Sequence, residues 1–187
     1  MNLLIDKLPT DYEGLKINTN FRSFILFELL MQDKELEDKD KILLALRLFF
    51  EEPPENLKKS IEAILWFYRC GKDVKETKNK KSEQKENKKQ IYSYEYDADL
   101  IYSAFLSQYG LDLNKIDYLH WFKFKALFEG LKSDNKICEI MGYRAIDLNK
   151  IKDKDEKARY KKLQREYALP DNRTEEEKEQ DFANALW

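Results

Sequence analysis

The spacing of apolar residues predicts a mainly helical protein. In the first third of the chain, apolar positions recur every three or four residues, in segments that follow capping side chains or stop at proline or glycine. The third segment is the most regular, because its apolar residues share one face and Gly71 follows in the position that favours glycine. The helices predicted there cover residues 21–31, 38–50 and 57–70.

The same periodicity returns after residue 90. Asn114 is a candidate cap for a helix at 115–131, whose apolar side chains point in nearly every direction around the axis. A helix of that kind is normally buried, so we expect it to be the hub of this half. The predicted helices cover residues 100–109, 115–131, 135–141, 153–167 and 174–187.

Two other segments complete the organisation. Short apolar stretches at 3–5 and 15–17 flank a turn-forming segment and suggest a small hairpin. Residues 72–90 contain eight lysines, four acidic residues and one aliphatic residue, a composition typical of a flexible linker. We therefore predict an all-α fold, as two small helical lobes or as one helical domain interrupted by a long charged loop, with or without the N-terminal hairpin. The predicted parts are an N-terminal lobe, a linker and a C-terminal lobe, at residues 1–71, 72–90 and 91–187.

Charge and composition narrow the classes of partner. The chain has 34 basic and 36 acidic residues, a net charge of −2, so no overall field attracts it to nucleic acid or to an anionic membrane. The linker lacks arginine and aromatic residues, which favours a solvated spacer over a nucleic-acid tether. Neither a secretion signal nor an apolar run of membrane-spanning length is present, so we expect a cytoplasmic protein.

Candidate chemistry is sparse. His120 is the only histidine and precedes Trp121 in the predicted hub, where a structural role is the simpler interpretation. Cys70 and Cys138 lack metal-ligand spacing. The acidic cluster Glu95, Asp97 and Asp99 lies at a predicted helix start, where capping and the helix dipole already favour carboxylates. The sequence therefore predicts no catalytic residue, cofactor-binding residue or metal ligand, and a protein that is not an enzyme.

Large aromatic residues are the candidates for contact with a partner. Trp66 and Phe67 lie beside the apolar stripe of the third helix rather than on it. They form either part of a binding surface or a contact with the second half of the chain. Phe182, Leu186 and Trp187 lie at the end of the last predicted helix, and docking on the chain itself is again the alternative.

Longer segments carry a family resemblance. They include LLIDKLP, INTNFRSFILFELL, LWFYRCGK, IYSYEYDADLIYSAFLSQYGLDL, YLHWFKFKALFEGL, MGYRAIDLNKIKDKDEKARYKKL and YALPDNRTEEEKEQDFANALW. In these segments the chain resembles the phage gene-product-fifteen family of long-tailed phages and prophages infecting Gram-positive bacteria. One departure is Trp121-Phe122, where the family often has two tryptophans, a change expected to alter packing more than function.

The resemblance implies a role in tail morphogenesis, because members of the family sit near the tape-measure gene. Genes at that position usually encode tail assembly chaperones, which bind the tape-measure protein and help the tail-tube protein polymerise around it. The implied partners are therefore the tape-measure protein and the tail-tube protein, with no nucleic acid, no membrane and no cofactor, in the cytoplasm of the bacterial host. Homo-oligomerisation is compatible with this role. The alternative is a structural virion component, such as a tail-completion or connector subunit.

Overall fold

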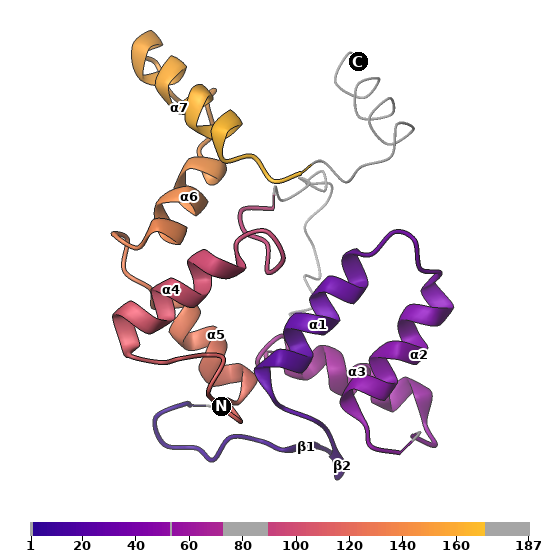
Figure 1. Ribbon diagram of the computed structural model, residues 1–187. Coiled ribbons are helices and arrows are strands. Elements are labelled where there is room, and N and C mark those ends of the chain that lie inside the picture. The colour runs from indigo at the N-terminus through magenta and orange to yellow at the C-terminus, as the bar shows by residue number, and fades with distance from the viewer. Residues whose placement is uncertain (1, 53, 73–89, 171–187) are drawn as a thin grey trace, which may run out of the picture.

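The computed structural model describes residues 2–52, 54–72 and 90–170. These residues form seven α-helices and one two-stranded sheet (Figure 1), so the prediction of a helical protein is confirmed. The helices are α1 (Phe21–Gln32), α2 (Asp38–Phe49), α3 (Leu57–Tyr68), α4 (Ala98–Tyr109), α5 (Trp121–Glu129), α6 (Lys136–Ala145) and α7 (Lys154–Glu166).

The N-terminal hairpin exists but is shorter than predicted. Strand β1 (Asp11–Tyr12) pairs antiparallel with β2 (Leu15–Lys16), and the two residues between them, Glu13 and Gly14, both have positive φ. Tight hairpin turns require this backbone conformation. The predicted first strand at residues 3–5 is wrong, because that segment forms a turn in which the Asp6 N–H donates to the Asn2 carbonyl at 2.9 Å.

Side-chain caps set the starts of the first and third helices. The Asn20 side chain accepts a hydrogen bond from the Arg22 N–H at 3.1 Å, and the Asn56 side chain accepts one from the Lys59 N–H at 3.0 Å. Each bond satisfies a donor that the first turn of a helix leaves without a partner. The predicted bounds of these helices are confirmed to within two residues.

Helix α5 begins six residues later than the predicted start at Lys115. The backbone before it pairs instead with the segment that enters α1. The Phe21 N–H donates to the Leu119 carbonyl at 2.9 Å, and the Trp121 N–H donates to the Thr19 carbonyl at 2.8 Å. These bonds between distant segments hold Leu119 and His120 outside the helix, so α5 is fixed against the start of α1.

Helix α6 is longer than predicted. Gly142 does not end it, because the helix continues to Ala145 and a methyl group at Gly142 would meet no atom within 4 Å. Gln164 from α7 donates to the carbonyls of Tyr143 and Ile146, both at 2.8 Å, where the helix has run out of its own donors. The extension places Arg144 on the buried stripe of Ile137 and Ile140.

The core is aromatic and centres on α5, which confirms the predicted hub. Trp121, Phe122 and Phe124 are almost completely buried. The Phe124 ring stacks on Phe21 of α1 at 4.9 Å between centroids and on Phe105 of α4 at 5.1 Å. One core therefore combines residues from both sides of the lysine-rich segment, with α5 between α4 and the start of α1 (Figure 1).

Helix α6 contributes Ile137 to this core and packs on α4, and α7 extends beyond it (Figure 1). Helix α7 has no fully buried residue and packs on α6, where Tyr143 contacts Tyr160 and Tyr167 at 6.4 and 6.0 Å between ring centroids. Among the helices in the described ranges, none is long and apolar enough to cross a membrane.

Candidate functional site

The aromatic pair predicted for partner binding packs inside the chain. Phe67 is fully buried and lies 5.6 Å from Phe122 between ring centroids. Trp66 is half-buried between Tyr12 at 5.6 Å and Phe122 at 6.0 Å. Both residues therefore contact Phe122 in the second half of the chain, which was the alternative to a binding surface. The other predicted contact residues lie outside the described residues: Phe182, Leu186 and Trp187.

The single histidine is part of the structural framework. The His120 Nδ1 atom accepts the Phe122 N–H at 3.1 Å and so caps α5, which assigns the proton to Nε2, bonded to the Pro9 carbonyl at 2.9 Å. Burial lowers the pKa of His120 from its ordinary value of 6.5. The ring is neutral at physiological pH, and both nitrogens are occupied.

Both cysteines are half-buried free thiols. Burial raises the pKa of Cys70 to about 11, although the nearby Lys125 ammonium acts in the opposite direction, and burial also raises the pKa of Cys138. Both side chains are therefore protonated thiols at neutral pH, and neither is an activated nucleophile.

The acidic cluster divides in the structure. Glu95 and Asp99 are exposed, whereas Asp97 is buried and forms an ion pair with Arg144. Asp97 also accepts the Ser93 N–H at 2.9 Å, so its carboxylate does not cap α4. Within the described ranges, no three acidic, histidine or cysteine side chains are close enough to hold a metal ion.

Arg144 joins four segments of the second half. Its Nη1 and Nη2 atoms donate to the two carboxylate oxygens of Asp97 at 2.6 and 3.0 Å. Its Nε atom donates to the Tyr167 carbonyl at 2.6 Å, and Nη1 also donates to the Ile91 carbonyl at 3.1 Å. The guanidinium therefore ties the entry of α4 and the exit of α7 to α6. Arg144 was not among the predicted site residues, because the predicted helix ended at residue 141, before Gly142. The signal that could have found it is the helical spacing of Arg144 from Ile140.

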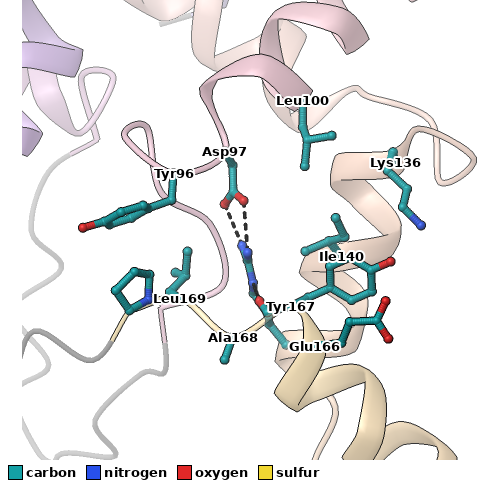
Figure 2. A pocket seen from close by; sticks show the side chains of 11 residues that line it. Tyr96, Asp97, Leu100, Lys136, Ile140, Glu166, Tyr167, Ala168 and Leu169 are labelled. Carbon is teal, nitrogen blue, oxygen red and sulfur yellow. Dashed lines mark hydrogen bonds and ion pairs between the residues drawn. The ribbon is translucent and has the colours of Figure 1, made fainter.

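A pocket of about 390 Å³ lies beside this ion pair. Tyr96 and Leu169 lie on one side of the Asp97 carboxylate, and Leu100 and Ile140 lie on the other (Figure 2). The complete lining comprises Tyr96, Asp97, Leu100, Lys136, Ile140, Arg144, Glu166, Tyr167, Ala168, Leu169 and Pro170.

Four of the eleven residues that line the pocket are charged, and none of these charges is buried without a partner. Asp97 and Arg144 neutralise each other, while Lys136 and Glu166 are exposed, with the Lys136 ammonium 5.2 Å from the centroid of the Tyr167 ring. Ligand pockets have volumes of about 300–1,000 Å³, so this one is at the small end of the range. Its volume exceeds that of one large side chain, and an apolar occupant would leave no buried charge without its partner.

The chain is thus a mainly helical protein with a small apolar pocket between α4, α6 and the segment after α7. Comparison with protein families matches residues 4–169 to the bacteriophage Gp15 protein family, and the chain belongs to that family. It is therefore a phage structural or morphogenesis protein. No curated protein and no solved structure matches the chain significantly.

Proposed function

We propose that the chain is a tail assembly chaperone-like protein that binds the tape-measure protein and supports assembly of the tail tube around it. Family membership supplies the phage context. The observation that carries the proposal is the mainly apolar pocket, whose two buried charged residues, Asp97 and Arg144, already pair with each other. Recognition of a helix commonly uses apolar anchor side chains at helical spacing, and this pocket accommodates one such anchor.

The role requires binding without chemistry. A long tape-measure protein exposes helical apolar stripes before the tube encloses it, and covering them prevents aggregation. The heavily charged surface of this chain, with 37% charged residues, keeps such a complex soluble in the host cytoplasm. The tail-tube protein is the second partner in this proposal, because it replaces the chaperone as the tube grows.

The test is co-expression with the tape-measure protein of the same phage genome, followed by affinity purification and measurement of the soluble fraction. We expect co-purification and increased solubility. Ala168 lines the pocket, so Ala168→Trp fills it and is expected to weaken the complex at least about tenfold, the equivalent of about 1.4 kcal/mol. Ala158→Trp, at an exposed alanine on α7 outside the pocket, is the matched control and leaves binding unchanged.

A tape-measure protein that is equally soluble alone and does not co-purify would refute this role. Mass spectrometry of purified virions then tests the alternative, a tail-completion or connector subunit. A chaperone is absent from finished particles, whereas a structural subunit remains in them at the fixed stoichiometry of a symmetric ring.

A further inference from the structure

Helix α2 has more apolar surface than the described chain covers. Between Ile42 and Phe49, Arg47 is the only polar residue, a composition normally found in helices that are buried all round. Helix α2 nevertheless packs mainly against α1 and α3. It leaves Ile42, Leu43 and Leu44 exposed by 38%, 47% and 39%.

Ile42, Leu43 and Leu44 are consecutive residues, so their exposed side chains spread around the outer side of α2, and we call this exposed apolar segment the α2 face. Lys41 donates to the carbonyl of Met31 at 3.3 Å, so the end of α1 lies beside the start of α2, and Met31 is also exposed. In the described part of the second half, by comparison, the large apolar residues that are exposed are scattered singly: Tyr96, Leu106 and Tyr118. Contiguous exposed apolar residues of this kind mark interaction sites.

Negative charge flanks the α2 face at both ends. From Asp33 to Glu55 the chain has eight acidic and four basic residues, and all eight acidic side chains are exposed. They gather before the apolar run and after it: Asp33, Glu35, Glu37, Asp38, Asp40, Glu51, Glu52 and Glu55. A second copy of the chain would bring the same acidic groups against these, which is unfavourable, whereas a partner with basic flanks is complementary.

We propose that the α2 face binds an amphipathic helix of a partner protein that has lysine or arginine residues on both sides of its apolar stripe. The proposal rests on the proposed function, in which this helix belongs to the tape-measure protein. The eight residues of the run are about 12 Å long at 1.5 Å per residue. That length matches about two turns of a partner helix, with anchors at positions i, i+3, i+4 and i+7.

The first test compares two exposed leucines in binding to the co-expressed tape-measure protein. Leu43→Glu puts a charge in the α2 face, and Leu106→Glu puts one at a position of similar exposure, 43%, on α4. We expect Leu43→Glu to weaken the complex about ten- to a hundredfold, the loss expected from one buried leucine, and Leu106→Glu to have no effect. Thermal melts of both variants check that each is folded.

The second test changes charge alone. The triple variant Glu51→Lys, Glu52→Lys and Glu55→Lys keeps every apolar residue of the α2 face. We expect it to weaken the complex and to reduce the dependence of affinity on salt, because the partner's basic flank loses its counter-charges. Affinities are measured between about 50 and 500 mM salt. Over this range the Debye length, which is roughly 10 Å at 0.1 M, decreases from about 14 to about 4 Å.

The outcomes separate this inference from the function on which it rests. Equal binding by wild type, Leu43→Glu and Leu106→Glu overturns the α2 face as a binding site and leaves the proposed function intact. Absence of any complex with the wild type refutes the proposed function and, with it, this assignment of the helix. A wild-type dimer in sedimentation velocity that Leu43→Glu abolishes would assign the α2 face to a second copy, and would also overturn the proposal.

Discussion

Replacing Arg144 by methionine tests whether the guanidinium holds the second half together. The variant leaves the Asp97 carboxylate buried with the Ser93 N–H as its remaining donor. Removing one partner of a buried ion pair costs about 3–5 kcal/mol, because the other charge stays desolvated. That loss is a large part of a stability of about 5–15 kcal/mol. We expect Asp97→Leu to cost a similar amount, because it leaves the Arg144 charge unpaired.

The double variant Asp97→Leu/Arg144→Met separates the charge pair from the other bonds. Replacement of a buried pair by apolar residues is often neutral in stability. Here it also removes the partners of the Tyr167 and Ile91 carbonyls and of the Ser93 N–H. At about 1 kcal/mol for each lost bond, the double variant should remain about 3 kcal/mol below the wild type. It should thus lose much less than the sum of the two single variants.

Urea denaturation, followed by far-UV circular dichroism and tryptophan fluorescence, provides the four free energies of unfolding for the cycle. Lys58→Met is the control, because it removes an exposed i,i+4 ion pair with Glu62 at 4.0 Å and should cost less than about 1 kcal/mol. A double variant as stable as the wild type would refute the role of the carbonyl contacts. Single variants that lose less than about 1 kcal/mol would refute the stabilising role of the Asp97–Arg144 ion pair itself.

The remaining predictions concern the effect of pH and of two glycine substitutions on the free energy of unfolding. The folded pKa of His120 is below the ordinary 6.5, so its contribution is complete above pH 6.5 and is lost as the unfolded chain binds a proton below that value. The urea concentration at the unfolding midpoint should decrease when the pH is lowered from 7.5 to 5.5. The variant His120→Asn, which keeps a capping oxygen, should show a smaller decrease. Gly110 has a φ of +65°, so Gly110→Ala should lower the free energy of unfolding by about 1 kcal/mol. Gly142→Ala, inside α6 with open space around it, should raise that energy by about 0.5–1 kcal/mol, and thermal melts compare the two.

Much of the helical architecture could be predicted because its signals are local. Asn20 and Asn56 cap α1 and α3 through contacts two or three residues away, and Gly110 ends α4 in the left-handed conformation. Apolar residues on nearly every side of the predicted helix at 115–131 correctly indicated a buried hub, which the structure places at Trp121–Glu129. In each of these cases the information that determines the element lies within a few residues of it.

The parts that sequence reasoning missed depend on distant partners. Asn114 is a sound candidate cap, but the backbone bonds of Leu119 and Trp121 to the segment entering α1 delay the start of α5 to Trp121. These bonds join residues about a hundred positions apart along the chain. The pocket combines residues from three helical segments, and its central ion pair joins side chains 47 residues apart. Neither arrangement has a signature within one segment, so periodicity alone could not reveal it.

The position of α5 in the core has a consequence for synthesis on the ribosome. Phe21, Phe24 and Phe67 precede the lysine-rich segment, but they complete their packing with Trp121, Phe122 and Phe124. About 55 residues separate Phe67 from Phe122, and translation at about 5–20 residues per second takes about 3–11 seconds to cover them. During that interval the nascent first half exposes aromatic residues that later form its core. Until α5 is made, the first half therefore has the aggregation risk of an incompletely buried core.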